Sequence, residues 1–572
     1  MLMPLRASRV ALSPGWCRLL AASLILGATV LHLAYLAYEC PLDLAPDEAH
    51  YWDWSRPEHL DWSYYSKGPL IAYLIRGGCV AAGSWSVEQT GNLALAVRLP
   101  AIVCGALLLV SLYILTVQVY RCEVLALAVV GLALTLPLIA VGSSLMTIDA
   151  PYTCCWGWAL VLGHRAIFRG SKWAWPLLGV VLGLGMLAKY TMIVWIPSAA
   201  LFLLTTPAYR RLLWSRGFWC MVAVAGFCCL PILIWNAQHD WVTFRHVLGL
   251  SGLASGETPT LSPGGTGETP VEEPRIHWLG PLHYLGGQCA LLLVYWFLVW
   301  AAAMIAHRPD FRPAGRRSHQ PDEGALYLWW LSAPMFLMFL AFSPKTDGGE
   351  MNWPVTAYLS GLVLSAAWLA RQFDDPRRWY RVSTAINLGL ACVLGLAVTV
   401  FMHHSEWLYP LLTRLAGPPT KSNPFPLRRL DPTCRLRGWR TLAGKVDALR
   451  ARLRDEEGRD PVLAGTTWSM PGLLGVYCAG HPQAYSLGPL MGDRHSQYDF
   501  WDNPLDHRAA FQGRTFVVVN GDEDVLRAAF ASVKTTEVKH EERGQPIASW
   551  RLSVCRDFRG SFRLPRKASP TY

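Results

Sequence analysis

Long apolar runs separated by short polar stretches dominate the first 405 residues of the chain. Each run is close to the ~20 residues that an α-helix needs to cross a bilayer. The pattern therefore predicts an α-helical polytopic membrane protein with about eleven transmembrane helices. The first run, Leu19–Tyr38, follows three arginines and is interpreted as an uncleaved span. The other runs lie at 92–119, 122–142, 150–168, 174–190, 191–206, 218–236, 283–306, 325–342, 352–370 and 382–402.

Two apolar segments are short for a span. Residues 174–206 fit two short helices joined by a kink. Residues 69–83 are only about 15 residues long, which suits an interfacial or re-entrant helix.

The charges between the runs predict an orientation. The arginines and lysines gather in alternate short loops, at 120–121, 164–173, 207–217, 307–324 and 371–381, whereas the opposite short loops carry only Lys345. Since basic loops stay in the cytoplasm, we expect a cytoplasmic N-terminus in the cytoplasmic (inner) membrane. The loops 39–68 and 237–282 and the C-terminal part then lie outside.

The polar C-terminal part has the pattern of a separate domain. Residues 445–457 form a charged amphipathic helix pattern, and PVLAG (461–465) and TFVVVNG (515–521) resemble buried strands. We therefore predict two domains, a transmembrane domain over 1–405 and a small extracytoplasmic α/β domain over 406–572. A Gly/Ser/Thr/Pro-rich stretch at 251–270 is typical of an external loop.

Composition narrows the function classes. Of 572 residues 52% are hydrophobic and 16% charged, well below the ~25% charged of soluble domains. The net charge of +11 is explained by the short loops, so nucleic-acid binding is disfavoured. Most of the 15 cysteines lie in apolar runs; a disulfide among Cys434, Cys478 and Cys555 is left open, with no pair assigned.

The stretch PDEAHYWDWSRPEHLDWSYYSKGPL, residues 46–70, carries the strongest chemical signal. It joins the acids Asp47 and Glu48 to many aromatic rings and then to Lys67, all just after the first span. A solvated loop whose acids have no partner is the simpler interpretation. An acid beside a basic group at a membrane surface can instead combine a general base with a site for a lipid phosphate.

An ordered series of motifs resembles the bacterial membrane glycosyltransferases related to protein O-mannosyltransferases and lipid A aminoarabinose transferases (glycosyltransferase families 39 and 83). The matching stretches, covering roughly residues 17–405, are the 46–70 segment, VRLPAIVCGAL (97–107), MTIDAP (146–151), GLGMLAKYTM (183–192), WNAQHDWVTFRH (235–246) and EMNWPVTAYLS (350–360). The resemblance implies a GT-C fold and transfer of a sugar from a polyprenyl-phosphate donor to an acceptor on the outer membrane face.

The resemblance also implies roles for individual residues. Asp47 matches the family's acid and is the candidate general base, with inversion at the anomeric carbon. Glu48 either orients the acceptor or braces the loop. Lys67 matches a family lysine and, with the intramembrane Lys189, is expected to bind the donor phosphate. Some members carry glutamate before the loop lysine; here that position is Ser66, which argues against aminoarabinose as the sugar.

Five further residues are weaker candidates for the substrate cavity. Arg98 is expected to brace the first loop by pairing with an acid, and Asp149 either touches substrate or caps a helix. His239 and His246 are seven positions apart, but two histidines without a carboxylate make a poor metal site. A divalent metal is therefore possible but not favoured. The cavity candidates are Arg98, Asp149, His239, Arg245 and Trp353.

Two other functions compete with sugar transfer. A transporter or flippase of lipid-linked sugars would also explain the many spans, although an inverted repeat of broken helices is not evident. The other alternative is a family relative that has lost catalysis and only assembles a complex. The acceptor is left open between protein, lipid and glycan, and so is the sugar.

Overall fold

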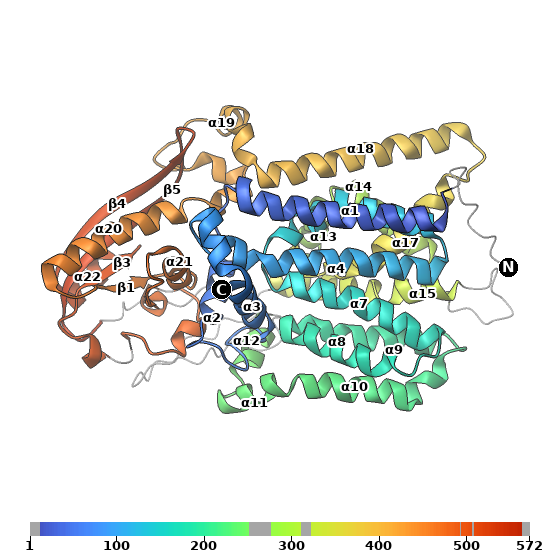
Figure 1. The fold of residues 1–572 in the computed structure, drawn as a ribbon, viewed down its shortest axis with the longest axis horizontal. Coiled ribbons are helices and arrows are strands. Elements are labelled where there is room, and N and C mark those ends of the chain that lie inside the picture. Colours follow the sequence, from blue (N-terminus) through green and yellow to red (C-terminus); the bar gives the residue numbers. More distant parts are fainter. Residues whose placement is uncertain (1–11, 251–275, 311–321, 492, 506–507, 563–572) are drawn as a thin grey trace.

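The computed structural model describes residues 12–250, 276–310, 322–491, 493–505 and 508–562. A bundle of long helices occupies one end of the molecule, and a region built around a β-sheet occupies the other (Figure 1). The short helix α2 and the helix α3 lie at the junction between them. The predicted loop at 251–270 lies outside the described residues.

Each of the predicted apolar runs is helical, because apolar side chains and internally bonded backbone are what a bilayer requires. The helices of the bundle are α1 (Pro14–Ala34), α4 (Ala94–Tyr120), α5 (Glu123–Thr135), α6 (Pro137–Ala140), α7 (Asp149–Phe168), α8 (Ala174–Ala188), α9 (Trp195–Thr205), α10 (Arg216–Cys228), α11 (Leu230–Gln238), α12 (Val242–Leu250), α13 (Gly280–Leu291), α14 (Tyr295–Ala306), α15 (Glu323–Trp330), α16 (Ala333–Thr346), α17 (Ala357–Gln372) and α18 (Arg378–His403).

Several of these helices are bent or short. Among the described residues five helical stretches are long and apolar enough to cross a membrane, and up to eight if each bent pair counts as one span. The predicted total of eleven spans therefore stays a prediction. The kink expected within 174–206 is confirmed: α8 ends at Ala188, Lys189 has an extended backbone, and a short 3₁₀ turn leads into α9.

The apolar segment predicted to be interfacial is α3, which is longer than expected and covers Leu70–Thr90. Its length and composition alone would allow it to span a membrane. Its contacts, however, are with the ends of other helices. Gly68, just before its start, touches the end of α8, and Gly78 in its middle touches the start of α4. Trp85 packs near the end of α1. A helix that crosses the ends of three others has the geometry expected at a membrane interface.

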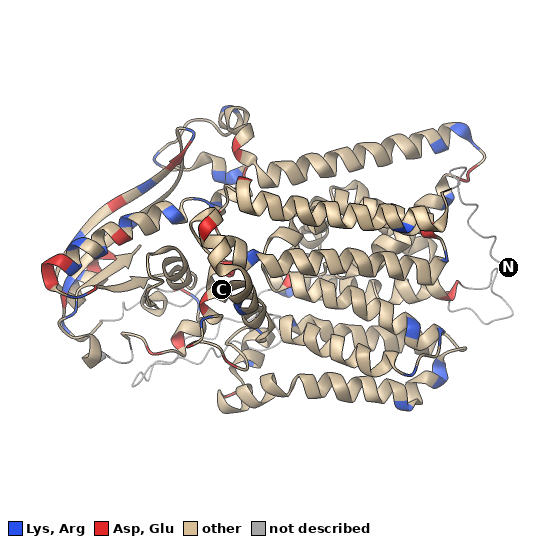
Figure 2. Ribbon diagram, in the orientation of Figure 1, with Lys and Arg blue, Asp and Glu red and all other residues tan. Residues whose placement is uncertain are grey.

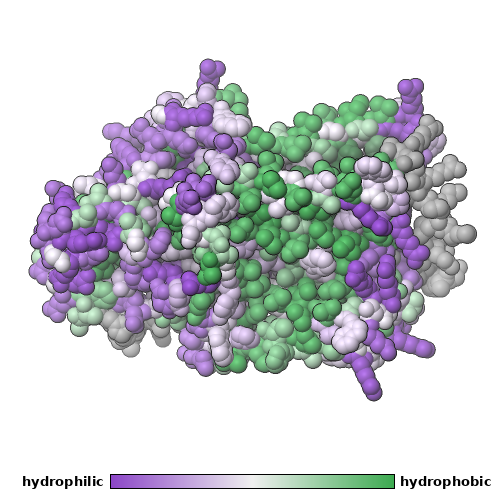
Figure 3. Space-filling view, in the orientation of Figure 1, coloured by the Kyte–Doolittle hydropathy of each residue, from purple (hydrophilic) through white to green (hydrophobic). Residues whose placement is uncertain are grey.

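The surface separates into zones along the long axis. An apolar band covers the helical bundle, with hydrophilic zones on both sides of it (Figure 3). Lysines and arginines gather at the end of the bundle remote from the sheet (Figure 2). A belt of apolar surface between polar ends is what a multi-pass membrane protein presents to lipid.

The C-terminal region contains a five-stranded mixed sheet in the order β2-β1-β3-β5-β4. Strands β1 and β2 are parallel, as are β1 and β3, whereas β5 is antiparallel to both β3 and β4. The strands are β1 (Val462–Gly465), β2 (Ala484–Ser486), β3 (Phe516–Val519), β4 (Phe530–Glu542) and β5 (Gln545–Phe558). The predicted strands at 461–465 and 515–521 are therefore confirmed.

Helices cover this sheet on both faces. Leu463 and Val517 join one apolar cluster, while Val462 and Val518 join another, because successive strand residues point to opposite faces. The predicted amphipathic helix is α20 (Trp439–Glu457). The long β4–β5 hairpin was not predicted, because β4 is largely exposed and rich in charge and lacks an apolar run. The other helices of the region are α19 (Tyr409–Ala416), α21 (Met470–Tyr477) and α22 (Glu523–Ala529).

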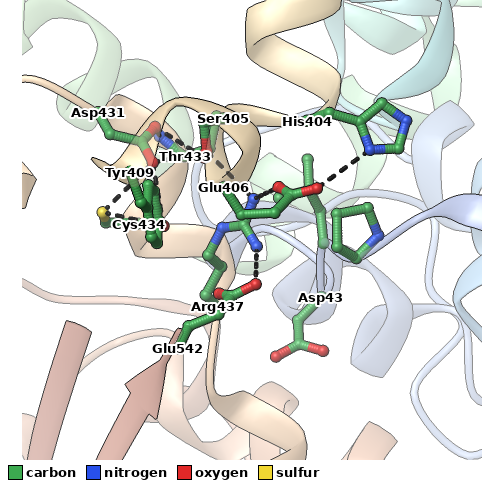
Figure 4. Close-up of polar contacts among 12 residues, drawn as sticks. Asp43, His404, Ser405, Glu406, Tyr409, Asp431, Thr433, Cys434, Arg437 and Glu542 are labelled. Atoms are coloured by element: carbon green, nitrogen blue, oxygen red, sulfur yellow. Dashed lines mark hydrogen bonds and ion pairs between the residues drawn. The ribbon is translucent and has the colours of Figure 1, made fainter. Parts of the chain in front are cut away.

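A buried polar network joins the end of α18 to the C-terminal region (Figure 4). Arg437 lies between two carboxylates and binds Glu406 at 2.5 Å and Glu542 of β4 at 2.5 Å. Beside it, the Ser405 hydroxyl donates to Asp431 at 2.6 Å. Removing one member of such a buried set would leave a charge unpaired, so the network holds the sheet against the bundle.

All 15 cysteines are free. Cys434, Cys478 and Cys555, for which a disulfide was left open, belong to three different apolar clusters. All three are buried and pack as small apolar side chains.

Candidate functional site

The first nine residues of the acidic stretch form a largely buried helix and not a solvated loop. Helix α2 (Pro46–Trp54) starts with proline at its first position, where no backbone donor is needed. Seven of its nine residues, Glu48–Trp54, are buried, and Trp54 stacks on Tyr64 with ring centroids 4.2 Å apart. Asp47 alone is exposed in this fully described helix. The rings therefore pack the segment and leave one acid accessible.

Glu48 and Arg98 form a bracing pair. Arg98 binds the Glu48 carboxylate at 2.7 Å, and both side chains are almost wholly buried. The same carboxylate accepts the backbone N–H groups of Ala45 and Met146, each at 2.8 Å. Because its oxygens are occupied in this way, the geometry favours the bracing alternative for Glu48. Arg98 braces α2 through this pair, as one expectation had it, and its place in a substrate cavity stays a prediction.

The lysine loop is held against the end of α8. A side chain at Gly68 would come within 2.3 Å of the Leu187 carbonyl oxygen, so only glycine allows this approach. The contact brings Lys67 close to Lys189, which follows α8 by one residue. Two lysines 122 positions apart in the chain thereby share one site.

Asp149 is the counter-ion of Lys189. The Lys189 ammonium binds one carboxylate oxygen of Asp149 at 2.7 Å, and Asn352 donates to the other at 2.6 Å. The ammonium also lies 5.3 Å from the ring centre of Tyr152. Asp149 is also the first residue of α7, where an acid suits the start of a helix. Here its carboxylate pairs with Lys189 as well.

Lys67 and Asp47 lie within electrostatic range of each other. Burial lowers the pKa of Lys67 to about 8, with Lys189 acting in the same direction and Asp149 and Asp47 opposing it. Asp47 is accessible, yet the surrounding protein displaces enough water to raise its pKa, while Arg494, Arg435 and Lys67 act to lower it. In the described part of the chain neither side chain makes a salt bridge.

Arg494 was missed by the sequence analysis. It comes from the segment 493–500 of the C-terminal region, and its guanidinium lies 4.0 Å from the ring centre of Trp468. In turn, Trp468 packs edge-on against His50 of α2 at 5.2 Å. No sequence motif surrounds Arg494, yet the residue lies within electrostatic range of Asp47, from which more than 400 positions of the chain separate it.

The remaining cavity candidates have other contacts. His239 stacks on Trp235 at 3.9 Å, and Trp353 packs on Phe339. Arg245 is exposed. His246, the residue after Arg245, lies within electrostatic range of Lys67 and Arg494.

Within the residues that can be described, no group of three or more His, Cys, Asp or Glu side chains is placed to hold a metal ion.

Several known proteins are similar to this chain in sequence. The family described as dolichyl-phosphate-mannose-protein mannosyltransferase matches residues 66–235. The lipid A galacturonosyltransferase RgtD of Rhizobium johnstonii is 28% identical over 383 residues, 66% of this chain and 71% of that protein. An undecaprenyl phosphate-alpha-4-amino-4-deoxy-L-arabinose arabinosyl transferase of Pseudomonas paraeruginosa is 25% identical over 371 residues, 62% of this chain and 59% of that protein.

Solved structures share the fold over nearly the whole chain. Crystal structures of ArnT from Cupriavidus metallidurans, in the apo state and bound to undecaprenyl phosphate, superpose with TM-scores of 0.54 and 0.55 at 15% sequence identity. They cover 93% and 95% of this chain and 97% and 98% of theirs. The ArnT-like fold thus includes the C-terminal region as well as the bundle.

Fold and sequence matches together define the class of this protein: it is a multi-pass membrane glycosyltransferase with the GT-C fold. Its sequence is similar to RgtD and to the arabinosyl transferase, and its fold is similar to that of ArnT. Both curated relatives are named as glycosyltransferases, so the transporter alternative finds no support among them.

Proposed function

We propose that this enzyme transfers a sugar from a polyprenyl-phosphate donor to an acceptor on the outer face of the cytoplasmic membrane. The donor class is supported by the arabinosyl transferase relative, whose name includes undecaprenyl phosphate, and by the ArnT structure that binds this lipid. The acceptor of the other relative is lipid A. A membrane glycolipid is accordingly the acceptor class that we favour.

Asp47 is the general base of the proposed reaction. It takes the proton of the acceptor hydroxyl while the acceptor oxygen forms a bond to the anomeric carbon. The bond from that carbon to the phosphate oxygen breaks, and its electron pair leaves with the polyprenyl phosphate. One such displacement inverts the anomeric centre. A carboxylate whose pKa is raised, as that of Asp47 is, removes a proton more readily than an ordinary aspartate.

Lys67 and Lys189 stabilise the phosphate, which gains one negative charge as it departs. The Lys67 ammonium has no carboxylate bound to it among the described residues, so it can accept this charge directly. Lys189 is held in place by Asp149 and Asn352. Its role is to fix the second side of the phosphate.

The orientation that we propose places the C-terminal region and α2 outside the cytoplasm. The basic end of the bundle, remote from the sheet in Figure 2, then faces the cytoplasm in accordance with the positive-inside rule. The acceptor and a lipid-borne donor would both reach Asp47 from the outer leaflet. In this arrangement α3 lies in the outer membrane interface.

The single observation that carries this proposal is the unpaired, accessible Asp47 next to the unpaired Lys67. Its test is a transfer assay in membranes with undecaprenyl phosphate carrying labelled galacturonic acid or labelled 4-amino-4-deoxyarabinose, the sugars named in the two relatives. We expect Asp47→Asn to lose at least about 10²-fold in rate, because general-base catalysis contributes about 10²–10⁴-fold.

Glu58→Gln is the matched control for this assay. Glu58 is an acid of the same external segment, but it is exposed and pairs with Arg56 on the surface. We expect it to keep the wild-type rate. Equal transfer by Asp47→Asn and wild type would remove Asp47 as the base, and movement of labelled lipid across the bilayer without transfer would favour a carrier.

A further inference from the structure

One segment of the C-terminal region contacts both halves of the site described above. The side chain of Gln497 accepts the backbone N–H of Tyr65, two residues before Lys67, at 2.7 Å. Tyr498 packs against His50, three residues after Asp47, with ring centroids 5.1 Å apart. The segment 493–500 therefore holds the base helix and the lysine loop in one arrangement, and Arg494 is part of it.

Several contacts fix the position of Arg494. Its guanidinium stacks on Trp468, and the backbone N–H of Trp468 donates to the neighbouring Asp493 at 2.5 Å. Trp468 itself rests on His50. A stacked arginine loses little further freedom when it binds a ligand, so this side chain is preorganised.

The charge of Arg494 is not neutralised by the protein. Among the described residues no carboxylate forms an ion pair with it, and Arg435, the second arginine close to Asp47, is exposed and likewise without one. Two unpaired guanidinium groups next to an accessible carboxylate are expected where an anionic ligand binds.

Arg494 and Lys67 are held by different elements: Arg494 stacks on Trp468, which packs on His50 of α2, whereas Lys67 belongs to the loop held against the end of α8. Lys189 and Asp149 are the charges that act most strongly on Lys67, whereas Arg494 and Arg435 are those that act most strongly on Asp47. Asp149 already neutralises the charge of Lys189. One donor phosphate between Lys67 and Lys189 would therefore balance the positive charge that the two lysines have left. The arginine side then has positive charge left for a second anion, next to the base.

We propose that Arg494, assisted by Arg435, binds an anionic group of the acceptor, a phosphate or a carboxylate, and so places the acceptor hydroxyl at Asp47. This inference rests on the proposed function and adds to it a specificity subsite supplied by the C-terminal region. The subsite explains why a region outside the bundle is packed directly on α2.

The test compares acceptors with and without their anionic groups. The acceptor is a membrane glycolipid extract, used untreated, after phosphatase treatment, and after amidation of its carboxylates. The full-length enzyme in membranes is assayed as wild type, Arg494→Gln, Arg494→Lys and the control Arg452→Gln. Arg452 is a half-exposed arginine on α20 whose partner, Glu456, is also on the surface.

We expect one of the two treatments to lower wild-type transfer about tenfold or more, which identifies the group as phosphate or carboxylate. Arg494→Gln should already show this lower rate with untreated acceptor and should not respond to the treatment. The KM for the donor should be unchanged, Arg494→Lys should recover part of the rate, and Arg452→Gln should behave as wild type.

Other outcomes would overturn the inference. A raised donor KM in Arg494→Gln would assign the residue to the donor phosphate, and equal losses with treated and untreated acceptor would make it a structural contact. A wild type that is indifferent to both treatments would rule out an anionic acceptor group. A wild type without any transfer would instead contradict the proposed function, and this inference with it.

Discussion

Adjacent acids in α2 have opposite roles because their side chains point to different surroundings. Glu48 faces the bundle, where Arg98 and two backbone N–H groups occupy its oxygens. Asp47 faces the accessible side, near Lys67 and Arg494. One carboxylate thus stabilises the helix, and the other is available for chemistry.

Removing the partner of Glu48 should destabilise the protein. We expect Arg98→Met to lower the free energy of unfolding by about 3–5 kcal/mol, because it leaves a buried carboxylate unpaired. Thermal unfolding of the purified protein in detergent measures this, with Arg452→Met as the surface control. An Arg98→Met protein as stable as the wild type would show that the pair does not brace α2.

The pKa of Lys67 predicts an alkaline limit to activity. Burial lowers this pKa to about 8, so the ammonium is charged below pH 8 and loses its proton above it. Donor kcat/KM should therefore fall about tenfold per pH unit above that point, since this parameter reports the free enzyme. Rates at several donor concentrations between pH 6 and pH 10 measure the effect.

Lys67→Arg distinguishes this cause from general alkaline inactivation. Arginine stays charged throughout the range, so the alkaline limb should disappear even if the rate is lower. An unchanged limb would assign it to another group. On the acid side, the raised pKa of Asp47 means that activity should be lost at a higher pH than an ordinary aspartate would give, because the base becomes protonated.

At the scale of elements, close backbone contacts bring the chemical groups together. Gly68 lies against the end of α8, and in the same way Gly472 of α21 lies where a side chain would meet the Ala49 carbonyl of α2 at 2.5 Å. Leu473 and Val476 of α21 complete an apolar cluster with α2. The base helix is thus packed between the bundle and the C-terminal region.

Adding a methyl group at Gly68 tests the first of these contacts. We expect Gly68→Ala to lower donor kcat/KM by about 10²-fold, because the lysine loop must move away from the Leu187 carbonyl and misplace Lys67. The transfer assay measures this loss. Gly77→Ala in α3 is the control, since nothing lies within 4 Å of the added carbon. A wild-type rate in Gly68→Ala would show that the contact does not position the lysine.

For the whole molecule, the C-terminal region covers the end of the bundle where the catalytic candidates lie. Its connections to the rest of the chain include the Arg437 network, the packing of α21 on α2, and Asp43, which binds Arg440 and accepts the backbone N–H of Trp439 at 2.8 Å. The site is therefore built from both regions of the chain.

The proposed orientation is tested by fusions to alkaline phosphatase, which is active only outside the cytoplasm. A fusion after Tyr572 should be active, and one after Asp375, in a basic loop of the bundle, should be inactive. Green fluorescent protein at the same two positions should give the opposite result, because it does not fluoresce after export through the general pathway. Activity of the phosphatase at Asp375 would reverse the orientation argued here from the basic loops.

Local patterns in the sequence determined much of this protein. Hydropathy is a property of consecutive residues, so the helical runs, the break near Lys189 and the membrane class could be predicted directly. The strands at 461–465 and 515–521 were found for the same reason, and the ordered motifs led to the GT-C class. Asp47 and Lys67 were named as candidates because they match those motifs, and Lys189 because a charge in an apolar stretch is costly unless it is paired or functional.

Tertiary structure alone decided which charges meet. The pairing of Glu48 with Arg98, of Lys189 with Asp149, and the arrival of Arg494 beside Asp47 join positions between 40 and more than 400 residues apart. The antiparallel β4–β5 hairpin likewise depends on pairing, because β4 has no apolar run of its own. Side-chain chemistry is written in the sequence, but the field around each carboxylate depends on which distant groups the packed chain brings to it.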